Sequence, residues 1–325
     1  MKILICDDSA LARKSILCSI VQTAETELLQ AENGREALQL MMEHNIDVLF
    51  LDLTMPVMDG FDVLRTLPVS NYHTEVIVVS GDVQRESQQR CLALGAKAFV
   101  SKPFRNEEVA DLFDALGLQF VGSLERQTPV NHQGATSPIS SLAKFRELTN
   151  VALGKGAAII SDHMHEFIQL PEPQVGPLTT GELQMTLVDV LNRPNSEAVT
   201  QRFVGGGVHG EALVCLRGSD IERVGERLGD CLDFSTHNEV LLNISNMLVS
   251  SFLTSLGNQL DLVFSLRQPA IIETLTAPDA TLRESEELFT IEYTYFAENL
   301  DFECEVLFLL DKTSVDIIYR IVEVL

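Results

Sequence analysis

Short apolar runs that end in polar residues recur along the first 120 positions of the chain. Lys2–Cys6, Val48–Leu51, Val76–Val79 and Ala98–Val100 are the clearest, and Glu27–Ala31 is a weaker fifth run. Runs of this length, bounded by polar and turn-forming residues, are typical of buried parallel strands. This part of the chain is therefore expected to contain a five-stranded sheet.

Helical patterns fill the intervals between these predicted strands. Ser9 can cap a helix that continues to about Gln22, and the Asn33-Gly34 turn opens a second helix. Glycine just beyond the last apolar position is a common helix stop, and two of the helices end in this way. The alternation predicts an α/β doubly wound, five-stranded parallel sheet covered on both faces. The helices expected after the first are Arg35–Glu43, Phe61–Leu67, Glu86–Leu94 and Glu107–Leu116.

Polar side chains with related chemistry follow the predicted strands. Asp7 and Asp8 follow the first strand, Asp52 the third, Ser80 the fourth and Lys102 the fifth. Open α/β sheets place their chemistry at the carboxyl ends of the strands, so these groups are expected to converge. Three carboxylates so close repel one another unless a cation lies between them or their pKa values rise. Oxygen ligands of this kind suit Mg²⁺, and a magnesium pocket with one lysine indicates phosphoryl chemistry on a carboxylate.

The same residues and their neighbours resemble the receiver domain of response regulators, the CheY-like family. The resemblance rests on the acid pair, on Asp52 followed by Met55–Gly60, on Ser80-Gly81 and on Lys102–Phe104, in this order. It implies that a histidine kinase transfers a phosphoryl group to Asp52. A degenerate receiver used only for docking is the alternative, and it is disfavoured because every site position carries a competent residue.

The resemblance also implies a role for each residue of the pocket. These roles agree with the electrostatic argument, because phosphoryl transfer depends on positioning and charge neutralisation. It further implies a cis peptide bond before Pro103. The implied roles are Mg²⁺ binding for Asp7, Asp8 and Asp52, binding of the phosphoryl oxygens for Ser80 and Lys102, and an aromatic switch for Phe99.

The chain changes character after the predicted receiver. Residues 121–140 are polar, rich in Pro, Gly and Ser, and show no periodicity, which is typical of a linker. The predicted organisation is a receiver domain over 1–120, a linker over 121–140 and a second domain over 141–325. About twenty flexible residues would span roughly 25 Å root-mean-square.

The second domain contains an internal repeat. Phe145–Asn150 aligns with Leu241–Asn246 at an offset of 96 residues, and Pro173 aligns with Pro269 at the same offset. Each copy then ends in an apolar strand followed by a helical pattern. The repeat predicts an α+β domain with pseudo-twofold architecture, with copies over about 141–228 and 237–325.

Each copy places two polar residues about one helical turn apart in an apolar stretch. They are Glu147 and Asn150 in the first copy and Asn243 and Asn246 in the second, and i, i+3 neighbours share a helix face. Such pairs are ordinarily solvated or capping residues, but their repetition at a fixed distance from a proline favours function. The pattern resembles the CheC/CheX/FliY phosphatases of bacterial chemotaxis.

This second resemblance implies a catalytic pair. Asn150 would orient a water molecule for attack on an aspartyl-phosphate, because an amide accepts and donates without adding charge. Glu147 would pair with the active-site lysine of the receiver. The second copy has Asn243 where the glutamate is expected, so Asn246 is the weaker candidate.

Composition narrows the classes of function. The net charge of −24 divides into −8 over residues 1–120 and −16 over the rest, and such acidity disfavours nucleic acid as a partner. Six scattered cysteines indicate buried free thiols in a reducing cytoplasm. The chain start shows no signal peptide and no apolar stretch approaches the length of a membrane span, so no membrane association is expected.

Together these observations predict a two-component response regulator whose output domain is an aspartyl-phosphate phosphatase. It would act on its own phosphorylated Asp52 or on a separate phosphorylated receiver. The alternative is a non-catalytic docking module for receivers or chemotaxis proteins. A transcription factor is disfavoured by the charge and by the lack of a helix-turn-helix segment.

Overall fold

A computed structural model describes most of the chain. The chain divides into two compact units, Met1–Glu147 and Leu148–Leu325, and each is described by itself. The predicted linker lies outside the described residues except for Ser140. The residues described are 1–21, 23, 25–67, 73–104, 106–118, 140–191, 193, 196–229, 236–272 and 288–324.

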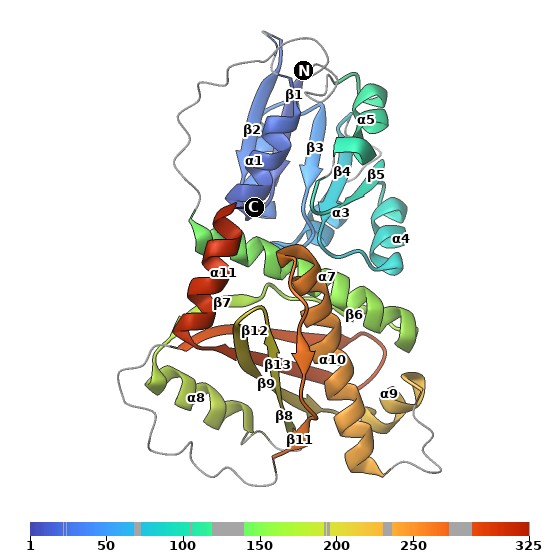
Figure 1. Ribbon diagram of the computed structural model, residues 1–325. Helices are drawn as coiled ribbons and strands as arrows, with labels where there is room; N and C mark the ends of the chain where they lie inside the picture. Colours follow the sequence, from blue (N-terminus) through green and yellow to red (C-terminus); the bar gives the residue numbers. More distant parts are fainter. Residues whose placement is uncertain are drawn as a thin grey trace. The chain divides into compact units, whose positions relative to one another are not determined.

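The first unit contains the predicted parallel sheet (Figure 1). Its strands lie in the order β2-β1-β3-β4-β5, and every pairing between them is parallel. The three central strands, β1, β3 and β4, are almost fully buried, as expected for apolar runs enclosed on both faces. The strands are β1 (Lys2–Cys6), β2 (Glu27–Ala31), β3 (Val48–Leu51), β4 (Glu75–Ser80) and β5 (Ala98–Ser101).

Five helices cover the two faces of this sheet. Helices α1 and α5 enclose one apolar core, in which Ile16 and Phe113 pack against β1 and β3. Helices α2, α3 and α4 enclose the other, with Met41, Val63 and Cys91. The doubly wound prediction is therefore confirmed. The helices are α1 (Ala10–Ser19), α2 (Gly34–Glu43), α3 (Gly60–Thr66), α4 (Arg85–Ala93) and α5 (Asn106–Ala115).

The predicted boundaries agree with the structure to within a residue or two, with one larger difference. Helix α1 ends at Ser19 and not near Gln22, because Ile20 adopts extended dihedral angles (φ −98°, ψ 127°). Ser9 caps α1 as expected, accepting a hydrogen bond from the Ala12 amide. The Lys102-Pro103 peptide bond is cis, also as expected.

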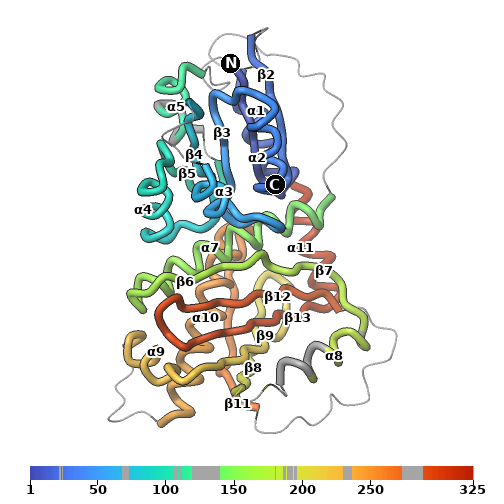
Figure 2. Tube along the Cα trace, turned by 180° about the vertical axis from the view of Figure 1, so that it is seen from behind, coloured from blue at the N-terminus to red at the C-terminus, as the bar shows by residue number. Residues whose placement is uncertain are grey.

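The second unit is built around an eight-stranded sheet, which Figure 2 shows from behind. The strands run in the order β10-β8-β9-β13-β12-β6, with β11 also pairing with β8 and β7 with β12. Two antiparallel hairpins, β8–β9 and β12–β13, form its centre. The strands are β6 (Ile168–Gln169), β7 (Gln174–Leu178), β8 (Glu197–Gly205), β9 (Val208–Arg217), β10 (Ser265–Leu266), β11 (Ala270–Ile271), β12 (Leu288–Ala297) and β13 (Glu303–Leu310).

The predicted repeat is present in this unit. Helices α7 (Ser141–Met164) and α10 (His237–Leu260) each have 24 residues. The short strands β6 and β7 of the first copy pair with β12 of the second, and β10 and β11 of the second pair with β8 of the first. Leu213 lies opposite Leu307 at the centre of the sheet, and these two residues also correspond in the two copies. A pseudo-twofold axis requires such a pairing.

Helices pack on both faces of the second sheet. On one face the ring of Phe252 in α10 packs, tilted, against those of Phe308 and Tyr293, with centroid distances of 4.7 Å and 5.5 Å. There α7 closely approaches α10, since a Cβ atom at Gly156 would lie 3.4 Å from the Phe252 amide nitrogen. On the other face Leu183 of α8 packs on β8, β9 and β13. The remaining helices are α8 (Thr180–Leu191), α9 (Ile221–Arg227) and α11 (Lys312–Val324).

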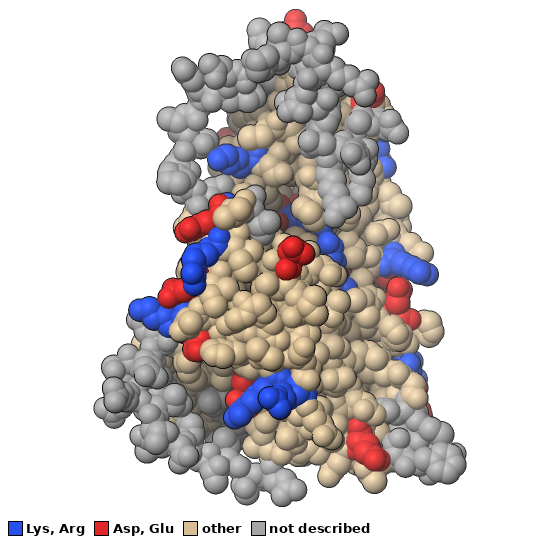
Figure 3. Space-filling model, in the orientation of Figure 1, with Lys and Arg blue, Asp and Glu red and all other residues tan. Residues whose placement is uncertain are grey.

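Two expectations from composition need correction. Helix α10 is long and apolar enough to cross a membrane, contrary to the expectation from the sequence, although 67% of the relevant window is buried inside the protein. Among the described cysteines, Cys18 is exposed and the other four are buried. Figure 3 shows Lys and Arg in small separate groups on the face that it presents, interspersed with Asp and Glu.

Candidate functional site

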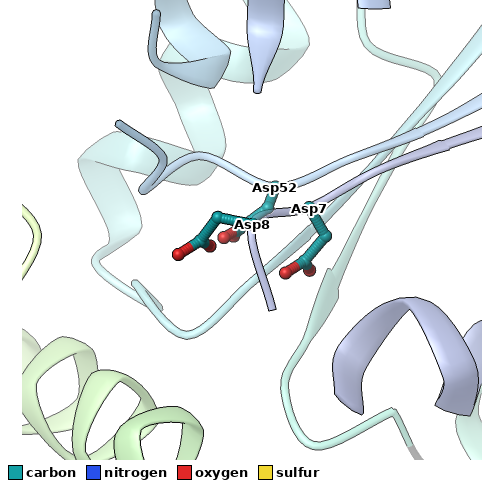
Figure 4. A group of neighbouring side chains, drawn as sticks. All are labelled: Asp7, Asp8 and Asp52. Carbon is teal, nitrogen blue, oxygen red and sulfur yellow. The ribbon is translucent and has the colours of Figure 1, made fainter. Parts of the chain in front are cut away.

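Three aspartates gather at the carboxyl ends of β1 and β3 (Figure 4). Asp7, Asp8 and Asp52 each offer an oxygen atom, and these oxygens lie within 4.8 Å of one another. Lys102, which follows β5, places its Nζ 2.8 Å from Asp7 Oδ2 and 3.2 Å from Asp52 Oδ2. The structure therefore brings these four predicted residues together.

Backbone hydrogen bonds orient two of the carboxylates. The Ser9 amide donates to Asp7 Oδ1 at 2.9 Å, and the Leu53 amide donates to Asp52 Oδ1 at 2.8 Å. The second oxygen of each carboxylate is buried and faces the lysine. These inward oxygens fit a small hard cation, because Mg²⁺ prefers oxygen ligands and binds through one or two carboxylates with waters.

Burial and charge shift the pKa values in this pocket. Burial raises the pKa of Asp52 and, more strongly, that of Asp7, and the Lys102 ammonium only partly opposes the change. Burial would lower the pKa of Lys102, but Asp52, Asp7 and Glu147 together hold it well above its usual value. Burial thus favours the neutral forms of both carboxyl groups, and a bound cation would favour their charged forms.

Glu147 is the third acidic partner of Lys102. Its Oε1 lies 3.3 Å from Lys102 Nζ, and its side chain is 11% exposed. Both residues belong to the first unit, which ends at Glu147 within α7. The resemblance to the CheC/CheX/FliY phosphatases implies a pairing of Glu147 with a receiver lysine, and Lys102 is such a lysine.

Ser80 and Phe99 occupy neighbouring strands of the first unit. Ser80 is the last residue of β4 and is fully buried, and its Oγ accepts a hydrogen bond from the Asp82 amide at 3.2 Å. Phe99 is partly buried in β5 and packs on the core beneath α2, α3 and α4. Their implied roles in phosphoryl binding and switching remain predictions.

Arg13, which the sequence does not predict as part of the pocket, and Gly60, which the sequence indicates only as a turn residue, both support the pocket. Arg13 of α1 donates from Nη1 to the carbonyl oxygens of Asp7 (2.8 Å) and Asp8 (3.2 Å), which fixes the turn carrying both aspartates. Gly60 begins α3 at a point where any Cβ atom would overlap the Asp52 carbonyl oxygen. The apolar pattern contains no signal for Arg13, whereas the Asp-Gly pair at 59–60 marks the tight turn.

The candidate residues of the second unit differ in their surroundings. Asn150 of α7 is half-buried, and no side-chain hydrogen bond is found for it within the described part of the chain. Asn246 of α10 instead accepts a hydrogen bond from Gln201 Nε2 at 2.7 Å. The two predicted asparagines are therefore equivalent in the repeat but not in their local bonding.

Comparisons with known proteins agree with the architecture of the first unit. Residues 3–114 match the model of the response regulator receiver domain. The chemotaxis protein CheY of Bacillus subtilis (strain 168) is 33% identical over 110 residues, which are 34% of this chain and 92% of CheY. The chain thus belongs to the response regulator receiver family, whose members bind Mg²⁺ in an acidic pocket and are phosphorylated by histidine kinases.

One further relative and one solved structure are each similar to part of the chain. The protein-glutamate methylesterase/protein-glutamine glutaminase of Bacillus subtilis (strain 168) is 32% identical over 172 residues, which are 49% of this chain. The chain spans only 47% of the length of that relative. One chain in the crystal structure of a CheX-CheY-BeF3-Mg+2 complex from Borrelia burgdorferi is 30% identical in sequence. The match covers 37% of this chain and 90% of that chain, with a TM-score of 0.33.

Proposed function

We propose that Asp52 is the phosphoryl acceptor and that Asp7 and Asp8, with Asp52, hold the Mg²⁺ ion. The convergence of the buried oxygens with Lys102 supports this assignment. Bound Mg²⁺ would neutralise the carboxylates and the transferred phosphoryl group. Ser80 would donate its hydroxyl to a phosphoryl oxygen, and Lys102 would pair with another.

We further propose that the chain is an aspartyl-phosphate phosphatase, acting in a chemotaxis pathway as the CheY relative does. The observation that carries this proposal is the contact between Glu147 and Lys102. A carboxylate on Lys102 would fix the register of α7, which carries Asn150 one turn further along. Positioning of this kind can lower a barrier by several kcal/mol, on the order of 7 for well-oriented groups.

The proposed hydrolysis needs no covalent step on α7. The Asn150 side chain would hydrogen-bond a water molecule in line with the phosphorus–oxygen bond of phosphorylated Asp52. The water oxygen forms a bond to phosphorus as the bond to the Asp52 oxygen breaks, and its electron pair returns to the carboxylate. Inorganic phosphate leaves, and the proton of the water passes to phosphate or solvent.

The decisive experiment follows the loss of phosphate from Asp52. The full chain is phosphorylated with acetyl phosphate and Mg²⁺, the donor is removed, and the decay is compared for wild type, Glu147→Ala and Asn150→Ala. Both variants are expected to retain phosphate about a hundred times longer or more, the scale of losing one group that acts in the transition state. Glu226→Gln and Asn258→Ala, which change exposed residues of α9 and α10, are matched controls.

The outcome separates catalysis from docking. If both variants decay at the wild-type rate, α7 does not hydrolyse the phosphate of its own chain. A separate phosphorylated receiver protein is then added to the Asp52→Asn chain, and acceleration would show activity on a partner. Binding without acceleration would favour the docking module.

A further inference from the structure

The second copy of the repeat has an open groove of its own. It has a volume of about 590 Å³ and lies between α10, with Glu239, Asn243 and Asn246, and the segment 266–269, with Arg267. These α10 positions form one helix face, because they are spaced by three or four residues. The groove corresponds in the repeat to the surface that carries Glu147 and Asn150.

Gln201 holds the asparagine of this groove. Its Nε2 donates to Asn246 Oδ1 at 2.7 Å and to the Arg267 carbonyl oxygen at 2.9 Å, so it joins both walls. Gln201 lies in β8 and is only 1% exposed. A buried amide with two such bonds is costly to displace, since an unmade buried bond costs about 1–3 kcal/mol. One of the two acceptor positions of the Asn246 oxygen is therefore occupied, and the bond holds this side chain toward β8.

Among the described residues, the first copy shows no such constraint on Asn150. Gln201 pairs with Ala212 of β9, whose counterpart in the second copy is Val306, and Val306 pairs with Tyr293 of β12. Tyr293 thus occupies the place of Gln201, packed against Phe252. Within the described residues it makes no hydrogen bond to Asn150.

We propose that the α10 groove is a latent phosphatase site, inactivated by the Gln201–Asn246 hydrogen bond and by Asn243 in place of a glutamate. The inference rests on the proposed function of α7, and it makes α7 the only working copy. Gln201 acts through Asn246 and is therefore a positioning residue. Two substitutions, Gln201→Met and Asn243→Glu, are expected to open the site. Methionine keeps the length of glutamine without its donor.

The test measures hydrolysis both within one chain and in trans. In trans, the substrate is the full chain with Asn150→Ala and Asn246→Ala, phosphorylated on Asp52, and the tested chains carry Asp52→Asn. With Asn150→Ala present, Gln201→Met plus Asn243→Glu is expected to restore the decay rate at least tenfold, on the scale of one transition-state group. Adding Asn246→Ala to that variant should abolish the gain, whereas adding Asn258→Ala, at an exposed position of the same helix, should change it less than twofold.

Several results would overturn the proposal. One is a loss of rate in Asn246→Ala equal to that in Asn150→Ala, because the second copy would then already be active. Another is an unchanged decay rate in Gln201→Met plus Asn243→Glu when circular dichroism shows that this variant is folded. Gln201→Leu in place of Gln201→Met provides a second test with a side chain of different shape. A third is an unchanged Asn246 side-chain amide resonance in Gln201→Met. If Asn150→Ala decays normally while the opened variant gains activity through Asn246, the proposed function of α7 fails and the latent site stands.

Discussion

At the scale of single residues, backbone hydrogen bonds hold the charged groups of the pocket close together. Asp7 and Asp52 each bind one amide through one oxygen and turn the other toward Lys102. The sequence predicts these residues because each directly follows a buried strand. It cannot predict Arg13, because a side chain that binds backbone carbonyl groups leaves no trace in the hydrophobic pattern.

Arg13 is expected to control the affinity of the pocket for Mg²⁺. Its guanidinium also donates to Gln30 and Glu32, so both aspartate carbonyls depend on a fixed arginine fork. Arg13→Lys loses that fork. Loss of a hydrogen bond that orients metal-binding residues lowers the metal affinity about 10- to 100-fold. Titration calorimetry with Mg²⁺ should show the loss. Arg35→Lys, an exposed change in the neighbouring α2, should leave the affinity within twofold, and equal affinities in both variants would contradict the prediction.

Gly60 is expected to tolerate no side chain. A Cβ atom there would overlap the backbone of Asp52, which cannot move without distorting the pocket. Gly60→Ala should lower the free energy of unfolding by about 2 kcal/mol or more, as overpacked sites do, and should slow phosphorylation of Asp52. The control is Gly181→Ala in α8, where a Cβ atom meets nothing within 4 Å. That change should stabilise the helix slightly, and urea unfolding of both variants provides the comparison.

At the scale of elements, local signals and non-local pairings differ in how much the sequence reveals. The repeat predicts α7 and α10, and the glycines at 205–207 indicate the β8–β9 turn, where Gly206 and Gly207 have positive φ. Nothing local predicts that β10 and β11 would pair with β8, because those partners are more than 60 residues apart. The hydrogen bond from Gln201 to Asn246 depends on the same non-local arrangement.

The start of α10 is expected to be sensitive to acid. Thr236 and Glu239 form a capping box, and hydrogen bonds from Thr236 lower the pKa of Glu239. A depressed pKa contributes stability above the ordinary glutamate pKa, near 4.3, and that contribution disappears as the pH falls through the lowered value. Wild type should therefore exceed Glu239→Gln in stability at about pH 6, and the difference should shrink at about pH 3. Urea unfolding at both pH values measures it.

The matched control for the capping box is Glu226→Gln. Glu226 is an exposed residue of α9 that takes no part in a capping box. The difference in the free energy of unfolding between Glu226→Gln and wild type should not shrink between about pH 6 and about pH 3 as it does for Glu239→Gln. A constant difference for Glu239→Gln would contradict the role assigned to its charge.

At the scale of the whole molecule, the proposed phosphoryl acceptor and the proposed phosphatase helix belong to one chain. The predicted linker of 121–140 connects them, and twenty residues reach at most about 70 Å when fully extended. Groups tethered over such lengths meet at an effective concentration of about millimolar. A second molecule at micromolar concentration competes poorly with that tether. For the proposed phosphatase activity, such a tether would favour hydrolysis within one chain wherever it permits contact.

This argument predicts that the decay of phosphorylated Asp52 is independent of protein concentration. The decay constant should be the same at about 0.1 µM and about 10 µM chain, because an intramolecular step is first order. Unphosphorylatable Asp52→Asn chain, added in tenfold excess to phosphorylated Asn150→Ala chain, should accelerate the decay less than twofold. A decay constant that rises in proportion to concentration, together with rescue by the added chain, would instead place Asn150 of one molecule on Asp52 of another. The Asn150→Ala background makes the two routes distinguishable, because any rescue there must come from the added chain.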